Sequence, residues 1–195
     1  MNRTPSFLAL ALFALPAFGG ETALSQTAVV ERVLDGDTVV VRGFRQRVRL
    51  ANIDAPELSH GFGRPGQPFS VQAARWMEKK VHGQVVQLRC PDEDRYGRPV
   101  CDLFLRGEHV NKELVRAGLA WANTANARYL RDSSVLQAQR EAQSSRRGLW
   151  TQARPMPPWR WRRECWSQRL CAGVDPAVRL EPASTASPVT DRRRD

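Results

Sequence analysis

The sequence predicts an α+β fold that is mainly β: a small closed or partly closed barrel with helices packed on it. Between residues 27 and 150, five short segments are rich in β-branched and aliphatic residues, which is typical of strands. Segments with the spacing of amphipathic helices lie between and after these strands. Strands and helices interleaved within so short a stretch favour one small barrel domain.

The five expected strands begin with a hairpin. Residues 27–42 contain two runs of β-branched residues, and Asp35-Gly36-Asp37 separates them. Asp-Gly is a strong signal for a tight turn between two strands. The other three strands are expected at residues 44–53, 84–90 and 99–107.

Three helices are expected. The first runs from about Ser70, which can cap it, to Val81, and Gly83 ends it. Its expected apolar face consists of Val71, Ala74, Met77 and Val81. The second helix is expected at residues 109–118 and the third, capped by serine, at residues 133–148, and each ends at a glycine.

The two ends of the chain differ from this domain. Residues 1–19 have a basic start, an apolar stretch and small residues at a cleavage position, which predicts a signal peptide; an uncleaved anchor remains open. No later segment is apolar enough to span a membrane, so the mature protein is expected outside the cytoplasm, secreted or periplasmic. Residues 151–173 form a Pro/Trp/Arg-rich extension, and a disordered tail is expected over residues 174–195.

The charge and the cysteines narrow the class of protein. A net charge of +10 indicates an anionic partner such as nucleic acid or a membrane surface, although solubility alone can also explain it. Four cysteines in an exported chain favour disulfides over a zinc site, which would need closer Cys or His spacing. Sequence proximity favours Cys90–Cys101 and Cys165–Cys171 among the three possible connectivities.

Three polar stretches, each at the end of an expected strand, carry the candidate chemistry. They are DGDT (35–38), RLANIDAPE (49–57) and DRYGR (94–98). If the barrel brings them together, clustered carboxylates face two arginines. With no His or Cys beside them, such carboxylates favour a hard cation such as Ca²⁺ or Mg²⁺, and arginines bind phosphate oxygens. Alone, DGDT is only a turn and DRYGR only a polar loop.

These three motifs in this order, with VNKELVRAGLA and GLW after them, resemble the thermonuclease family, whose type member is staphylococcal nuclease. The resemblance covers roughly residues 27–150. It implies a five-stranded OB-type barrel with three packed helices and one Ca²⁺. Separately from the resemblance, a monomer is expected. It also implies hydrolysis of DNA and RNA with low sequence specificity, by water, leaving 3′-phosphates.

The resemblance also implies roles for individual residues. Asp37, Asp54 and the backbone carbonyl of Ala55 would bind the metal, with Asp35 and Thr38 behind them. Glu57 would orient or deprotonate the attacking water. Arg49 and Arg98 would bind the scissile phosphate, and Arg95 and Tyr96 a terminal phosphate. Ala55 stands where the type member has threonine, and Arg95 where it has lysine.

Two alternatives to an enzyme remain: a non-catalytic nucleic-acid-binding module of the same fold, and a cationic protein that binds the cell envelope. For the extension, "PMPPWRWRRECW" favours tryptophans packed against the domain, or else stacked on single-stranded bases. A bond between Cys90 and Cys101 would restrain the loop that carries Arg98.

Overall fold

The computed structural model describes residues 25–171 of the 195-residue chain. The predicted signal peptide (1–19) and the predicted tail (174–195) lie outside these residues. The strands are β1 (Ser25–Val33), β2 (Thr38–Val41), β3 (Val48–Leu50), β4 (Ile53–Asp54), β5 (Val85–Glu93), β6 (Pro99–Leu105), β7 (Glu108–His109) and β8 (Trp121–Ala122). The α-helices are α1 (Ser70–Val81), α2 (Val110–Arg116), α3 (Ser134–Ser144) and α4 (Pro158–Trp161).

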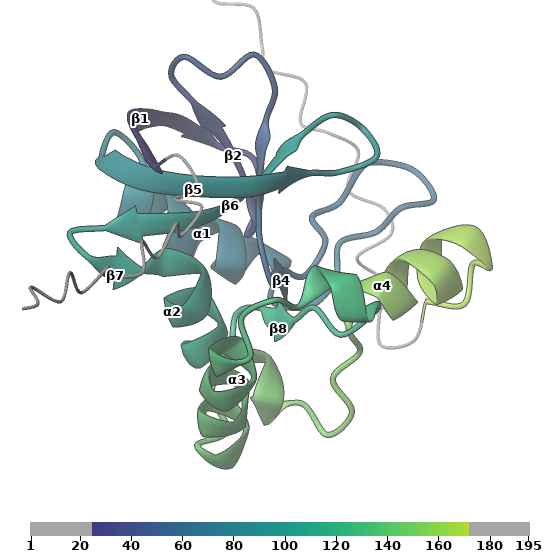
Figure 1. Cartoon of the computed structure of the whole chain (residues 1–195). Coiled ribbons are helices and arrows are strands. Elements are labelled where there is room, and N and C mark those ends of the chain that lie inside the picture. Colours follow the sequence, from purple (N-terminus) through teal and green to yellow (C-terminus); the bar gives the residue numbers. More distant parts are fainter. Residues whose placement is uncertain (1–24, 172–195) are drawn as a thin grey trace, which may run out of the picture.

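Five of these strands close into a barrel, as expected for the OB-type fold. The sheet order is β3-β2-β1-β5-β6-β7, and a parallel pairing of β3 with β6 closes it, with Arg49 opposite Val100. Strands β4 and β8 form a separate two-stranded sheet. In Figure 1, α2 and α3 lie together below the barrel, and α4 lies near β4 and β8. The α+β barrel prediction is therefore confirmed.

The third strand differs from its prediction. Residues 44–53 were expected to be one strand, but only β3 and the first residue of β4 are extended there. Asn52 lies between them with a φ of 66°, a left-handed conformation that Asn tolerates better than most residues. The resulting corner redirects the chain, so that Asp54 leaves the barrel wall beside β8.

The first helix has the predicted bounds but a different buried face. Its buried residues are Ser70, Ala73, Met77 and Val81, whereas Val71 is exposed. Ser70 is the first helical residue, and Phe69 takes the capping position without a side-chain bond. The alanine that contacts the core is therefore Ala73 and not Ala74.

The other two helices are shorter than predicted. The side chain of His109 caps α2 by accepting a hydrogen bond from the backbone of Lys112. Helix α3 ends at Ser144 rather than Gly148, and Asp132, not a serine, accepts a bond from its first residue, Ser134, at 2.9 Å. Two 3₁₀ helices (Ala127–Tyr129 and Gly148–Thr151) and a π-helix (Arg162–Ser167) complete the fold.

A buried asparagine joins helix α2 to the closing strands. Asn111 is fully buried, and its amide donates to the carbonyls of Ala51 and Cys101 at 3.0 and 3.1 Å. Its side-chain oxygen accepts from the backbone of Leu103 at 3.1 Å. These three bonds fix α2 against the place where β3 meets β6. None of the helices in residues 25–171 is long and apolar enough to cross a membrane.

Candidate active site

The β1–β2 turn and the β3–β4 corner carry the first two candidate acids. Asp37 follows Gly36 in the turn, and Asp54 ends β4. Both are almost fully buried, at 4% and 1% exposed. Because a buried carboxylate is unstable without a cation or hydrogen bonds, each of these acids must have partners inside the protein.

Glycine at position 36 allows the turn to lie against the corner. A Cβ placed there would come within 2.6 Å of the Ala55 Cβ and 2.9 Å of the Ala73 Cβ. This close approach brings Asp37 to Ala55, whose N–H donates to the Asp37 carboxylate at 2.6 Å. The turn and the corner therefore pack together, and both lie against helix α1.

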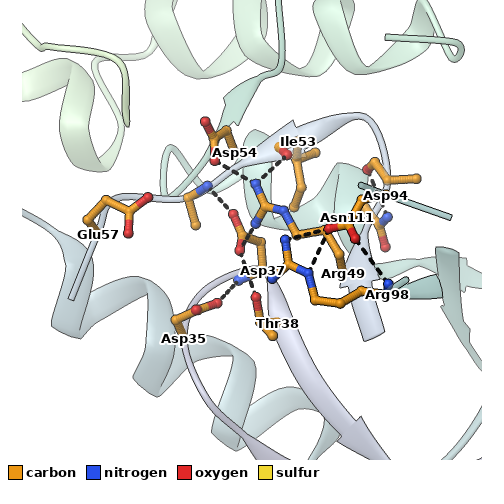
Figure 2. A network of polar contacts seen from close by, with 12 residues as sticks. Asp35, Asp37, Thr38, Arg49, Ile53, Asp54, Glu57, Asp94, Arg98 and Asn111 are labelled. Atoms are coloured by element: carbon orange, nitrogen blue, oxygen red, sulfur yellow. Dashed lines mark hydrogen bonds and ion pairs between the residues drawn. The ribbon is translucent and has the colours of Figure 1, made fainter. Parts of the chain in front are cut away.

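One arginine bridges the two acids. Figure 2 shows the Arg49 guanidinium between them, with Nη1 paired to Asp37 and Nη2 to Asp54, the latter at 2.6 Å. Arg49 comes from β3, directly opposite Thr38 of β2. One guanidinium therefore offsets the negative charge of both buried carboxylates.

Asp35 and Thr38 both contact Asp37. The Asp35 carboxylate accepts a bond from the Asp37 backbone at 2.9 Å, and the Thr38 hydroxyl donates to the Asp37 carboxylate at 3.3 Å. Burial raises the pKa of Asp35 above its ordinary value, while Arg49 and Arg98 act in the opposite direction. Both residues therefore orient Asp37 from the side away from Asp54.

Arg98 approaches from the β5–β6 loop. Its position is fixed by Asp94, which accepts bonds from the Arg98 backbone at 3.0 Å and from Nε at 2.7 Å. Burial favours the neutral form of Asp94, but the bonds from Arg98 and Tyr96 outweigh it and lower the pKa below its ordinary value. Since Arg49 pairs with Val100, two residues after Arg98, the closed barrel brings both arginines to one region (Figure 2).

The same loop presents Arg95 and Tyr96 to solvent. Tyr96 is exposed, and the Arg95 guanidinium lies 4.8 Å from its ring centre. A disulfide joins Cys90 of β5 to Cys101 of β6 across the base of this loop, and a second disulfide joins Cys165 to Cys171. Both pairings are those that sequence proximity favoured.

Glu57 lies outside the Arg49 bridge, to one side in Figure 2. Its partner is Arg162, an arginine of the extension, which pairs with Glu57 and also binds both oxygens of Asp54 at 2.8 and 3.2 Å. Burial raises the pKa of Glu57, and the Arg162 charge partly opposes this. Arg162 was missed in the sequence, because nothing near residue 162 indicates partners more than 100 residues away.

The extension is attached to the loop that follows Glu57. Trp161 is 1% exposed, and its ring N–H donates to the carbonyl of Pro65 at 3.2 Å; Trp166 donates to the same carbonyl at 3.0 Å. Gln67 accepts from the Glu57 backbone and donates to Met156 at 2.5 Å. Of the two interpretations of this segment, these contacts support packing against the domain.

The oxygen atoms of the buried acids are suited to a hard cation, but the protein offers few of them. Asp37 and Asp54 offer only carboxylate oxygens, the donors that a hard cation prefers, and the Arg49 guanidinium holds positive charge between them. Within residues 25–171, no group of three or more His, Cys, Asp or Glu side chains converges as a metal site. A cation here would therefore depend on two carboxylates and on oxygens from the backbone, water or substrate.

Comparison with known proteins agrees with this geometry. The model of the family described as "Staphylococcal nuclease homologue" matches residues 47–152, more than half of the chain. An "Uncharacterized endonuclease" of Escherichia coli O157:H7 is 40% identical over 136 residues, 68% of this chain and 82% of that protein.

Two further relatives are similar over most of their length. "Protein ParB" of Escherichia coli is 34% identical over 180 residues, covering 87% of this chain and 94% of its own. "Micrococcal nuclease" of Shigella flexneri is 34% identical over 145 residues, covering 69% and 79%. At the level of the family, these matches support a nuclease. The chain belongs to the staphylococcal nuclease family.

Proposed function

We propose that this protein is an exported, Ca²⁺-dependent nuclease that hydrolyses DNA and RNA with low sequence specificity and leaves 3′-phosphate products. The observation that carries the proposal is the bridge of Asp37 and Asp54 by Arg49, with Glu57 at its edge. This combination provides ligands for a cation, a donor for phosphate and a base for water within one small region.

The two barrel arginines would bind the scissile phosphate. Arg49 is held on β3 and Arg98 is oriented by Asp94, so each guanidinium is positioned before substrate arrives. Forked N–H donors suit phosphate oxygens and stabilise the charge that develops on them in the transition state. Contacts to phosphate contain no base information, which explains the low sequence specificity that we propose.

Asp37, Asp54 and the carbonyl of Ala55 would hold the cation. When bound, Ca²⁺ would offset negative charge on the phosphate and supply a site for water. The remaining chemistry belongs to Glu57, which would accept a proton from the attacking water. The water oxygen forms a bond to phosphorus, the bond to the 5′ oxygen breaks, and that oxygen takes up a proton.

Arg95 and Tyr96 would contact the substrate beyond the scissile bond. Both lie on the exposed β5–β6 loop next to Arg98, and the Tyr96 ring is open to solvent. We place the protein outside the cytoplasm, secreted or periplasmic, as a monomer. This placement rests on the predicted signal peptide and agrees with the two disulfides, which form readily in oxidising compartments.

The proposal is tested by plasmid degradation with the purified full chain. Cutting is expected with Ca²⁺ and should stop with chelator, and Glu57→Gln should slow it at least 100-fold, in the range typical of a lost general base. The matched control is Glu31→Gln, because Glu31 pairs only with exposed Arg42 on the surface, and it should cut normally.

Each negative result of this assay would reject a different part of the proposal. No cutting by the wild type would reject the enzyme and favour a non-catalytic nucleic-acid-binding module. Equal cutting with chelator would reject only the metal, and full activity of Glu57→Gln would reject only the role of that residue. Analysis of the product ends tests the 3′-phosphate, and amino-terminal sequencing of protein recovered from culture fractions tests export.

A further inference from the structure

The guanidinium of Arg162 pairs with Asp54 and Glu57, which the proposed reaction needs for binding the metal and accepting a proton. Within residues 25–171, the hydrogen bonds of its side chain all go to Asp54 and Glu57: both oxygens of the first and one oxygen of the second. Asp54 is 1% exposed, and its remaining partner is Arg49. The carboxylate of Asp54 is thus already bound by two positive groups.

The backbone around Arg162 is fixed, while its side chain is not fully enclosed. Trp161 and Cys165 on either side are each 1% exposed, and a disulfide joins Cys165 to Cys171. The Arg162 side chain is 39% exposed. A change of side-chain rotamer can therefore withdraw the guanidinium from the acids without detaching the extension.

We propose that Arg162 is a built-in competitor of the metal, so that the carboxy-terminal extension weakens cation binding at Asp54 until the guanidinium moves away. This inference rests on the proposed function, because it takes Asp54 as a metal ligand. A guanidinium and a divalent cation that share one buried carboxylate repel each other, and this repulsion is strong where water is excluded. The pairing with Glu57 also covers the group that would accept the proton.

The bound substrate gives the displaced arginine a new partner. A phosphodiester at Arg49 and Arg98 brings negative charge to the same region, and a guanidinium binds phosphate as readily as carboxylate. The competition between Arg162 and the cation for Asp54 should therefore be most visible when metal binding is measured in the absence of nucleic acid.

The test is a calorimetric titration of the full chain with Ca²⁺ in the absence of nucleic acid. Arg162→Gln should bind Ca²⁺ at least tenfold more tightly than the wild type. Arg162→Lys, which keeps the charge but loses the two-pronged geometry, should lie between them. The matched control is Arg163→Gln: Arg163 is the adjacent arginine, is 62% exposed and pairs with Glu164, so the same loss of charge should change affinity less than twofold.

A second readout separates competition from damage to the fold. The rise in melting temperature on adding Ca²⁺ should be larger for Arg162→Gln than for the wild type, because tighter binding stabilises the folded state more. Unchanged or weaker Ca²⁺ binding by both Arg162 variants would overturn the proposal and leave the nuclease proposal intact. Absence of Ca²⁺ binding in wild type and variants alike would overturn this inference together with the metal assignment.

Discussion

Gly36 is the residue at which a single methyl group should damage the site. Its φ lies outside the left-handed region, so alanine is compatible with the backbone and only space decides the outcome. The added Cβ would lie 2.6 Å from the Ala55 Cβ and 2.9 Å from the Ala73 Cβ. Ordinary contacts between carbon atoms are about 3.5–4.0 Å, so relief requires movement of roughly 1 Å.

Neither neighbour can make room by rotating a side chain, because an alanine Cβ is fixed by its backbone. The strain must move the turn, the corner or helix α1, and overpacking of this kind costs about 1–3 kcal/mol. With both contacts on Cβ atoms that their backbones hold in place, we expect about 2–3 kcal/mol. For a chain of this size that corresponds to a fall of roughly 4–12 °C in melting temperature.

The same movement should affect catalysis. Asp37 is joined to Ala55 by a bond of 2.6 Å, so a shift of about 1 Å displaces a proposed ligand, and such a displacement can cost on the order of 100-fold in rate. The assays are thermal melting by circular dichroism and kcat/KM on single-stranded DNA.

Two further variants give this experiment its controls. Gly43→Ala has no atom within 4 Å of the new Cβ, but a φ of +85°, so it should lose about 1 kcal/mol and keep its activity. Gly36→Ala combined with Ala55→Gly should recover part of the lost stability, with a coupling of about 1 kcal/mol. Wild-type melting and wild-type kcat/KM in Gly36→Ala would refute the reasoning.

Three more changes have defined outcomes. Asn111→Leu removes three buried hydrogen bonds to the backbone, of whose acceptors the Cys101 carbonyl keeps its bond from Ala51, and should lose about 2–4 kcal/mol in urea unfolding; a loss below 1 kcal/mol would contradict this. The pKa of Asp94 in the folded protein lies below its ordinary value of 3.8. The ionised Asp94 therefore contributes fully to the free energy of unfolding above pH 3.8, and this contribution is lost as the pH falls through the folded pKa. Asp94→Asn should therefore lower the free energy of unfolding at pH 7 by about 1–2 kcal/mol, and by less below the folded pKa of Asp94, and it should raise KM by loosening Arg98. Replacing Cys90 and Cys101 with alanine removes a bond spanning 11 residues, and should cost about 3 kcal/mol and raise KM; unchanged values of both would show that this disulfide does not restrain the loop.

The strands and helices could be predicted because their signals are local. Runs of β-branched and aliphatic residues mark β1, β2, β5 and β6, and Ser70 and Gly83 bracket α1. The corner at Asn52 was missed because its geometry depends on distant groups: the Asn52 side chain accepts bonds from the backbones of Arg131 and Asp132 and donates to Asp102. An asparagine within a strand pattern is only a weak signal of a corner. The contacts with distant residues are what make the corner necessary.

The candidate site was predictable to the extent that it lies in motifs. The convergence of Asp37, Asp54 and Arg49 could be expected from three polar strand ends, because a closed barrel brings strand ends together. The presence of Arg162 in the site could not be predicted, because its position depends on where Trp161 packs. The nearest sequence signal is the cluster of tryptophans around Arg162, which indicates a segment that packs against the domain.

The balance of charge explains why an arginine from outside the barrel reaches this site. Asp37, Asp54 and Glu57 would repel one another in a buried space, and Arg49 alone contacts only the two aspartates. Without a further positive group, Glu57 beside Asp54 would favour protonation or exposure to water. Arg162 supplies that charge to both acids, so the protein can hold the proposed metal ligand Asp54 in place without a metal. If Asp54 binds the metal as we propose, an arginine that stabilises the site in this way opposes the metal, since both would bind the same carboxylate. Preorganisation of the ligands and weaker cation binding are therefore two consequences of one contact.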